Sequence, residues 1–193
     1  MKISYIHGPG DAFGTFIQWR DKNRDKSIIK QTYSGQFYDL ISEIDGIGQL
    51  LCTTPCDKTG DSRFVFERVQ RGSATGVRYF LEEFLYAQRV SRLIKKFQPA
   101  VIILSSDFPT YYLDLLPRKP LKIISMHNTF WRPYGQPTGT KQIIINLVRK
   151  ISLRKCHFAV SVSRECKRQF DSLRSNRVTL STIQIPRLEE RFI

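Results

Sequence analysis

The sequence contains few cysteines, no long apolar segment and few acidic residues in its second half. Its cysteines are Cys52, Cys56, Cys156 and Cys166, and their spacing matches no zinc-binding pattern, so we expect reduced, inert thiols and no metal. No segment approaches the ~20 apolar residues that span a bilayer. The N-terminus lacks the uninterrupted apolar core of a signal peptide. These absences predict a cytoplasmic protein without disulfides.

The composition is that of a folded chain. Of its 193 residues, 41% are hydrophobic and 12% are aromatic. Disordered chains are poor in aromatic and β-branched residues, so we expect a packed core. The length suits a single domain.

Strand and helix patterns alternate along the chain. The predicted strands cover residues 2–7, 49–53, 64–69, 101–104, 123–126, 158–163 and 182–185. The predicted helices cover residues 12–25, 36–44, 76–97, 111–116, 140–154 and 164–173. The apolar strands lack strict alternation, which is typical of parallel strands covered on both faces. The pattern therefore predicts an α/β fold with a doubly wound, Rossmann-like parallel sheet.

The longest predicted helix, residues 76–97, has a broad apolar stripe, and its charged residues, such as Glu83, are expected to face solvent. In the next strand we expect Ile103 to be buried. Further upstream, Ser34 and Gly35 are interpreted as the break before the helix at 36–44. The apolar stripe consists of Val77, Phe80, Leu81, Phe84, Leu85, Leu93, Ile94 and Phe97.

The first predicted strand leads into a loop that contains Gly8, Gly10 and Gly14. Glycines between a strand and a helix let the backbone approach a ligand, and the N–H groups at a helix start favour anions. The spacing departs from the dinucleotide fingerprint because position 13 is Phe. The loop is therefore interpreted as a loop that binds a ligand other than a dinucleotide. The alternative is a tight turn that binds no ligand.

His127 and Asn128 follow the apolar strand at 123–126. Ligands of open α/β sheets bind outside the carboxyl ends of the strands. The polar and aromatic residues after Asn128 suit a carbohydrate, which needs hydrogen bonds and ring faces. His127 is the candidate catalytic residue, because imidazole can transfer protons near neutral pH. Ser163, at the end of another strand, is expected at the same edge. A buried structural histidine is the alternative interpretation.

Positive charge is concentrated between residues 118 and 177, which contain fourteen Lys or Arg and two acids, Glu165 and Asp171. This excess predicts an acidic partner, such as a phosphate group, an anionic membrane surface or an acidic domain, with nucleic acid less favoured. A solvated surface is the alternative. The basic amphipathic helix at 140–154 suits a membrane surface. Packing of its apolar side on the sheet is slightly favoured, because each helix of a doubly wound fold needs an apolar face.

In this order, the glycine loop, the His127-Asn128 pair and the strand that leads into Arg164 resemble the N-terminal domain of family 4, GT-B-type glycosyltransferases. The resemblance implies the acceptor-side half of a GT-B architecture over residues 1–185, with an interdomain linker starting at 186–193. The C-terminal domain that holds the nucleotide sugar in that family would be absent. It further implies that His127 contacts the transferred sugar, and that the glycine loop faces the cleft between the two domains.

Two functions are therefore expected. The leading one is transfer of a sugar from a nucleotide-sugar substrate to a carbohydrate or lipid-linked acceptor. We expect this reaction to need no metal or cofactor, and to take place at the inner face of the membrane if the acceptor is a lipid. A donor-binding domain in cis or in trans would complete the enzyme. The alternative is a non-enzymatic basic α/β module that binds anionic membrane or nucleic acid. Basic residues gathered around the glycine loop would favour the enzyme, and a separate basic stripe would favour the module.

Overall fold

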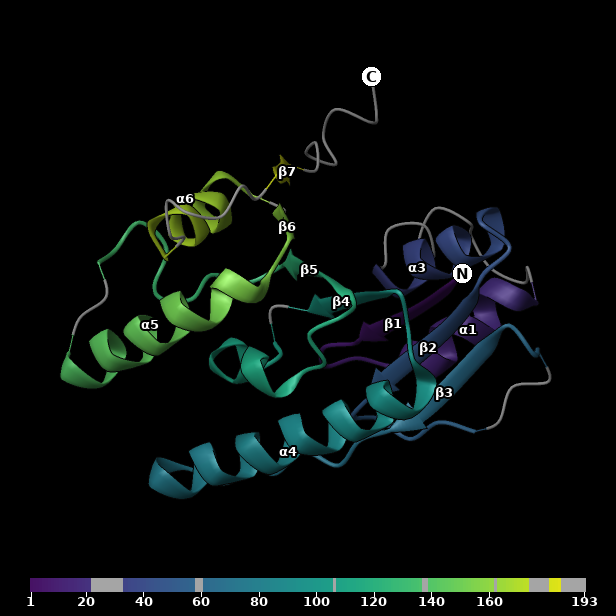
Figure 1. Ribbon diagram of the computed structural model, residues 1–193, viewed down its shortest axis with the longest axis horizontal. Coiled ribbons are helices and arrows are strands. Elements are labelled where there is room, and N and C mark those ends of the chain that lie inside the picture. Colours follow the sequence, from purple (N-terminus) through teal and green to yellow (C-terminus); the bar gives the residue numbers. More distant parts are fainter. Residues whose placement is uncertain are drawn as a thin grey trace.

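The structure is a computed structural model that describes residues 1–21, 33–57, 61–105, 107–136, 139–161, 163–173 and 181–184 (Figure 1). The strands are β1 (Lys2–Ile6), β2 (Ile47–Cys52), β3 (Phe64–Arg68), β4 (Val101–Ser105), β5 (Leu121–Met126), β6 (Phe158–Ser161) and β7 (Ser181–Gln184). The α-helices are α1 (Ala12–Arg20), α3 (Tyr33–Glu43), α4 (Gly76–Phe97), α5 (Thr140–Ser152) and α6 (Arg164–Leu173). Two short 3₁₀ helices are η1 (Thr110–Leu115) and η2 (Leu153–Lys155).

The strands form one parallel sheet in the order β3-β2-β1-β4-β5-β6-β7. This confirms the predicted doubly wound α/β fold. The chain extends the sheet outward from β1 through β2 to β3, and then returns through α4 to β4 on the other side of β1. The β1–β4 boundary is therefore the point where the strand order reverses, and ligand sites of such sheets lie beside it.

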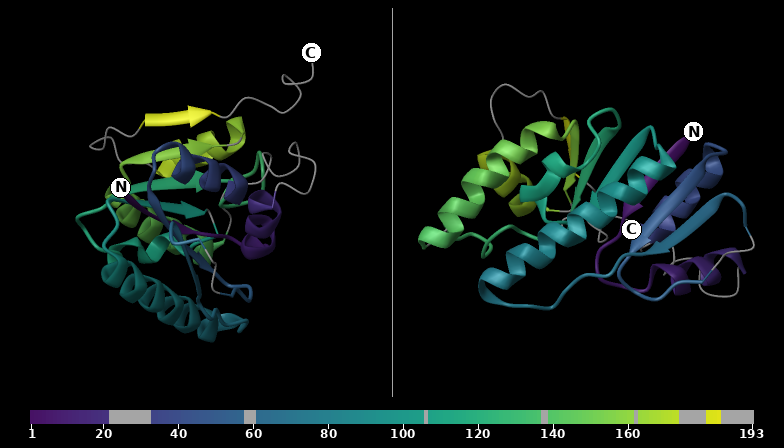
Figure 2. Two further views of the ribbon diagram at one scale, coloured as in Figure 1. Left: turned by 90° about the vertical axis from the view of Figure 1, so that its right-hand side faces the viewer. Right: turned by 60° about the horizontal axis from the view of Figure 1, so that its bottom comes forward.

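The core consists of two clusters of buried side chains, which lie on opposite faces of the sheet. One includes Phe16 of α1 and Tyr38 of α3. The other includes Val90 of α4, Ile102 of β4 and Phe170 of α6. Figures 1 and 2 show α4 and α5 on one side of the sheet and α1 with α3 on the other. The two layers hold the carboxyl ends of the strands at one edge.

The helix α3 begins earlier than predicted. Ser34 and Gly35, interpreted as a break, are buried residues of its first turn. Small side chains let this turn approach its neighbours closely, so packing overrides their weak helix propensity. The last part of the predicted helix at 12–25 and the predicted linker at 186–193 lie outside the described residues.

The predicted stripe of α4 is wrong in its first half. Val77 is 88% exposed and Leu81 is 58% exposed, whereas Glu83 is only 1% exposed. Arg71 makes this burial possible, because its guanidinium donates two hydrogen bonds of 2.7 Å to the Glu83 carboxylate. Figure 1 shows the first turns of α4 extending past the strands, so only its later turns reach the core.

Ile103 is also less buried than predicted, whereas its neighbour Ile102 is fully buried. The helices α4 and α6, with η1 and η2, pack in the cluster that contains Ile102. On the other face of β4, Ile103 is only partly buried and packs against the cluster that contains Phe16 and Tyr38. Ile103, Ile123 and Val160 therefore line a cavity of about 320 Å³ next to Phe37.

The four cysteines are free thiols. Burial raises the pKa of Cys52 and the pKa of Cys156 to about 12, so both thiols stay protonated at neutral pH.

Candidate functional site

Polar groups meet at the carboxyl edge of the sheet, where β1, β4 and β5 end. The carboxylate of Asp107, just after β4, joins them. It accepts a 3.0 Å hydrogen bond from the Ser105 hydroxyl and a 3.3 Å hydrogen bond from the side-chain amide of Asn128. The structure therefore brings Asn128, a predicted site residue, into contact with the carboxylate of Asp107.

Gly8 fits this edge because it has no side chain. A Cβ atom there would lie 2.5 Å from Asp107 Oδ2 and 2.9 Å from Ser105 Oγ. The backbone after β1 therefore packs directly against the groups that end β4. Gly10 has a φ of 146°, which L-residues rarely adopt, and its carbonyl accepts a 3.1 Å hydrogen bond from the Thr54 hydroxyl. The loop is held in one conformation at the point where the strand order reverses.

Gly14 lies inside α1 and serves the start of that helix. Its N–H donates a 2.8 Å hydrogen bond to Oδ1 of Asp11, the N-cap residue. A Cβ atom at Gly14 would lie 2.1 Å from Asp11 Oδ2. The N-cap contact alone accounts for glycine at this position, without a ligand.

His127 is half-buried at the end of β5. Its ring lies against the ring of Tyr33 in α3, with the ring centroids 3.5 Å apart. Burial lowers the pKa of His127 to about 4; Asp107 opposes this shift and His7 adds to it. The imidazole is therefore neutral at neutral pH, and it can donate or accept a hydrogen bond but is a weak base.

His7 lies on the other side of the strand-order reversal, after β1. Burial lowers its pKa as well, while the Gly8 carbonyl and the carboxylates of Asp107 and Asp11 act in the opposite direction. Nδ1 of His7 lies 2.8 Å from the Gly8 carbonyl oxygen. A carbonyl only accepts, so Nδ1 carries the proton and Nε2 of the neutral ring is an acceptor.

Ser163, the remaining predicted site residue, starts α6. Its hydroxyl accepts a 3.1 Å hydrogen bond from the backbone N–H of Cys166, and its carbonyl accepts one from Lys167. The strand therefore ends in a helix N-cap, as the sequence indicated. The structure gives this side chain a capping role.

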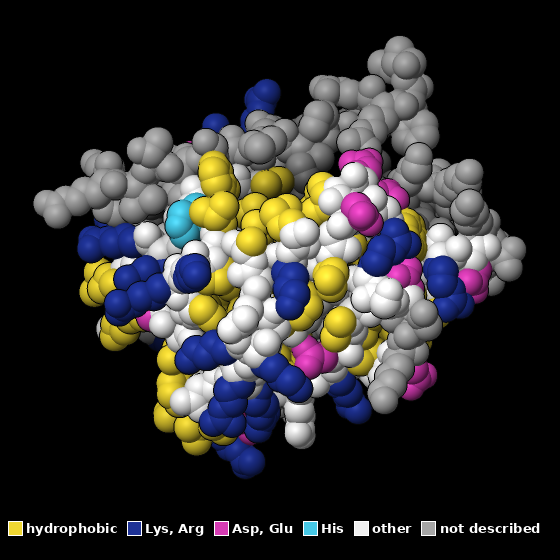
Figure 3. Space-filling model, turned by 45° about the vertical axis from the view of Figure 1, so that its right-hand side comes forward, with side chains coloured by type: hydrophobic (Ala, Val, Ile, Leu, Met, Phe, Trp, Pro, Cys, Tyr) yellow, Lys and Arg dark blue, Asp and Glu magenta, His cyan; other side chains and the backbone are white. Residues whose placement is uncertain are grey.

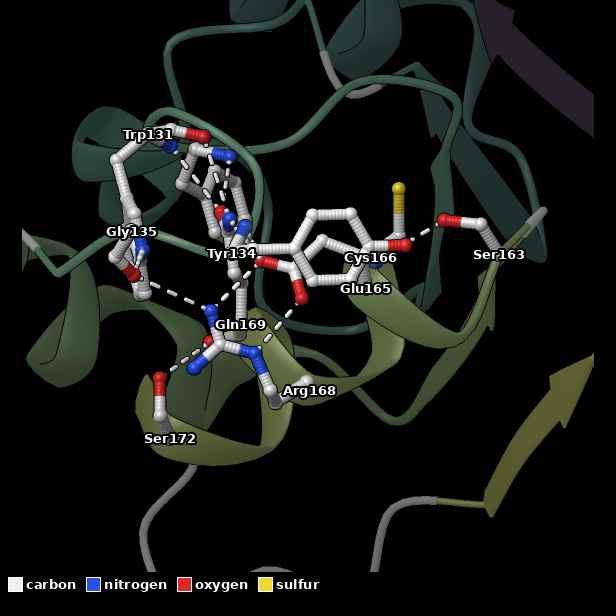
Figure 4. Close-up of polar contacts among 10 residues, drawn as sticks. Trp131, Tyr134, Gly135, Ser163, Glu165, Cys166, Arg168, Gln169 and Ser172 are labelled. Atoms are coloured by element: carbon white, nitrogen blue, oxygen red, sulfur yellow. Dashed lines mark hydrogen bonds and ion pairs between the residues drawn. The ribbon is translucent and has the colours of Figure 1, made fainter.

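The segment after His127 and Asn128 is fastened to α6 by two buried side chains (Figure 4). The side-chain carbonyl of Gln169 accepts hydrogen bonds from the backbone N–H groups of Phe130 and Trp131, at 2.7 and 3.1 Å. Glu165 accepts a 3.0 Å hydrogen bond from the N–H of Tyr134 and pairs with Arg168. These contacts lower the pKa of Glu165 to about 2, with the Arg168 hydrogen bond as the largest cause.

Sequence reasoning missed Tyr33, Glu165 and Gln169. For Glu165 a signal existed, because it is one of only two acids in a strongly basic segment. An isolated acid among so many cations suggests a specific partner. Tyr33 and Gln169 gave no such signal, since only the folded chain brings them to the segment after β5.

Among the residues that the structure describes, the basic side chains do not gather around the glycine loop. The groups that shift the pKa of His7 and of His127 are carboxylates, the other histidine and the Gly8 backbone, and no Lys or Arg is among them. Arg118, Lys122, Arg154 and Lys155 lie instead near the amino ends of β5 and β6. Figure 3 shows Lys and Arg side chains mixed with hydrophobic ones over the left and lower parts of one face.

The described residues contain no group of three or more His, Cys, Asp or Glu side chains arranged to hold a metal ion. None of their helices has both the length and the apolar character required to cross a bilayer. In comparisons with known proteins, no family model matches the chain and no curated protein matches it.

Proposed function

We propose that the carboxyl edge of the sheet around His127, Asn128 and Asp107, which we call the sugar cleft, binds a sugar and that the chain is the acceptor side of a nucleotide-sugar-dependent glycosyltransferase. The observation that carries this proposal is the Asn128–Asp107 contact beside His127 at the reversal of strand order. A carboxylate, an amide and a neutral imidazole can together donate to and accept from several hydroxyls. The ring of Tyr33 adds an apolar wall of the kind that sugar C–H groups contact.

The charges near the cleft are consistent with an acceptor side. Asp107 and Asp11 are the carboxylates that act on the pKa of His7, which lies next to the glycine loop. A diphosphate would be repelled by these carboxylates, so the nucleotide would be held by a second domain, in cis or in trans. His127, with its pKa lowered to about 4, would orient a sugar hydroxyl rather than remove a proton from it.

Ligand-observed NMR on the purified chain tests this proposal with a panel of acceptor saccharides and nucleotide sugars. We expect saccharide binding that is lost in His127→Ala and in Asn128→Ala. Gln142→Ala, which changes a polar residue on α5, is the matched control and should bind normally. With a donor-binding domain supplied, His127→Ala should lower the transfer rate by about 10²-fold or more. Saccharide binding that survives both cleft substitutions would contradict the proposal.

A second function, docking on an anionic membrane surface, is favoured by the orientation of α5. The predicted packing of its apolar side on the sheet is wrong. The helix turns a polar side inward: Arg149 donates a 2.9 Å hydrogen bond to the Thr110 hydroxyl, and the Ser152 hydroxyl donates to the Tyr111 carbonyl. The apolar side chains are 42–61% exposed, and they are Ile143, Ile144, Leu147, Val148 and Ile151.

The charge of α5 indicates which kind of partner would contact its exposed apolar side. The five apolar residues, which we call the α5 stripe, recur at spacings of three and four, so they share one side of the helix. The helix contains no acid, and Lys141 and Lys150 are exposed on it. An apolar side flanked by lysines suits the boundary between acyl chains and anionic headgroups.

Vesicle co-sedimentation tests the docking. The chain should bind phosphatidylcholine vesicles that contain phosphatidylglycerol, and less of it should bind as salt shortens the Debye length from ~10 Å at 0.1 M. Leu147→Ser with Ile151→Ser should abolish binding. Ile47→Ser with Val65→Ser, which changes exposed apolar residues of β2 and β3, should not. Equal binding by both double variants would refute docking through the α5 stripe.

A further inference from the structure

A basic hollow lies at the amino edge of the sheet, at the end opposite to the sugar cleft. Its volume is about 220 Å³, and it lies where η1 and η2 meet the starts of β5 and β6. Six of the residues that line it are charged or carry an imidazole: Asp114, Arg118, Lys122, Arg154, Lys155 and His157. Four Lys or Arg side chains therefore share one small hollow with a single acid, and a bound anion would balance this excess of positive charge.

Lys122 is the most unusual of these cations. It is 2% exposed, and its ammonium donates to the backbone carbonyls of Arg118 and Pro120, at 3.4 and 3.3 Å. Within the described residues no carboxylate lies at ion-pair distance from it. Burial lowers the pKa of Lys122, and the neighbouring charge of Lys155 lowers it further. A bound anion would relieve both effects.

Asp114 does not neutralise the hollow. It lies 3.8 Å from Lys155 Nζ, and both side chains are about half exposed, so water screens their attraction. In the described part of the chain, no carboxylate lies at ion-pair distance from the other three Lys and Arg side chains of the hollow.

His157 adds a hydrogen-bond donor of fixed position. Its Nδ1 accepts a 3.1 Å hydrogen bond from the backbone N–H of Lys122, so the proton of the neutral ring is on Nε2. The lining thus offers guanidinium, ammonium and imidazole N–H donors and little that accepts. Phosphate oxygens, which only accept when ionised, are the matching ligand class.

The hollow lies at one end of the α5 stripe. Ile151 is the last residue of the stripe, and Arg154 and Lys155 follow within the next turn of chain, in η2. A surface in contact with the stripe would therefore reach the hollow as well. The sugar cleft lies at the other end of β5, roughly 20 Å away for a strand of this length, so the two sites are separate.

We propose that this hollow binds the phosphate of an anionic lipid headgroup while the α5 stripe contacts the acyl boundary. The proposal rests on the membrane docking proposed above. It adds a defined headgroup site to a contact that would otherwise depend only on apolar area and net charge. It also fixes the orientation of the domain, because the hollow anchors one end of α5.

The test uses the full chain, two probes and three double variants. The probes are inorganic phosphate, followed by NMR shifts of the His157 ring, and phosphatidylcholine vesicles that contain phosphatidic acid. The hollow variant is Arg154→Gln with Lys155→Gln, and the stripe variant is Leu147→Ser with Ile151→Ser. The control, Arg20→Gln with Arg68→Gln, removes the same charge near α1 and β3. Thermal melts verify that each variant folds.

We expect the hollow variant to lose the phosphate-induced shifts and about tenfold or more in vesicle affinity. The stripe variant should lose vesicle binding but keep the phosphate shifts, and the control should keep both. If the hollow variant and the control bind vesicles equally, the headgroup site is wrong, even if docking through the stripe stands. If the hollow variant loses only the phosphate shifts, the ligand is a soluble phosphate and the lipid assignment is overturned. If the stripe variant still binds vesicles, the proposed docking fails.

Discussion

Replacing Gln169 by Leu should release the segment that connects the His127-Asn128 pair to α5. Gln169 is fully buried, and its side chain makes four hydrogen bonds: two from backbone N–H groups and two to acceptors on Trp131 and Glu165. Leucine has a similar volume, so the substitution removes these bonds and leaves little cavity. Its effect should therefore come from the polar groups that lose their partner.

The size of that effect follows from the two backbone N–H groups, those of Phe130 and Trp131, that lose their acceptor. A buried N–H without an acceptor costs about 1–3 kcal/mol. With two such groups, the free energy of unfolding should fall by about 2–6 kcal/mol, with the lower values expected if the segment moves outward and hydrates its amides. Glu165 would also lose one of the hydrogen bonds that support its ionised form.

Urea unfolding gives the stability change, and hydrogen exchange over residues 127–136 locates it. Gln142→Leu is the matched control, because within the described residues Gln142 bonds to Asn146, one turn away on α5, and its effect should stay under ~0.5 kcal/mol. We expect faster exchange of the Phe130 and Trp131 amides in the Gln169 variant alone. Equal stability of the two variants, with unchanged exchange at those amides, would refute the reasoning.

Three further predictions concern the core and the cleft. The contribution of His127 to stability should fall as the pH drops from about 6.5 to about 4 and then level off, because the unfolded chain protonates this histidine first. Urea melts across this range should therefore show a weaker pH dependence in His127→Gln than in the parent chain. Gly10→Ala should lower the free energy of unfolding by about 1–3 kcal/mol, because a residue with a side chain is strained at a φ of 146°. Thermal melts measure this loss, and a variant as stable as the parent would contradict that geometry. In urea unfolding, Ile102→Ala should lower the free energy of unfolding by about 2–5 kcal/mol, and Ile103→Ala should lower it distinctly less. The opposite ranking would contradict the burial of these two side chains described above.

Local patterns predicted the order of strands and helices because each element is selected by the spacing of its own apolar residues. They did not predict what each apolar side contacts. The sequence indicated the apolar side of α5, but not its exposure to solvent. That exposure depends on the polar contacts of Arg149 and Ser152 with residues about forty positions earlier in the chain. Glu83 looked like a solvent-facing charge because its partner, Arg71, lies outside the helix.

The cleft was partly predictable for a related reason. Parallel strands end at one edge, so the residues after β1, β4 and β5 had to meet, and the Asn128–Asp107 contact follows from that rule. The supports of the cleft were not predictable, because Tyr33 and Gln169 reach it only through the packing of α3 and α6. Ser163 and Gly14 show the reverse case, since both lie in strand-to-helix segments and the contacts found for them cap helices.

The position of β1 between β2 and β4 has a consequence for biosynthesis. As a ribosome releases the chain, β1, β2 and β3 can pair together with α1 and α3 while α4 is still in the exit tunnel. The second partner of β1 is much later in the chain: Ile3 pairs with Val101. Until that partner emerges, one side of β1 is an open edge on which another nascent chain can add a strand. Slow translation between β3 and β4 would therefore prolong the period of greatest aggregation risk.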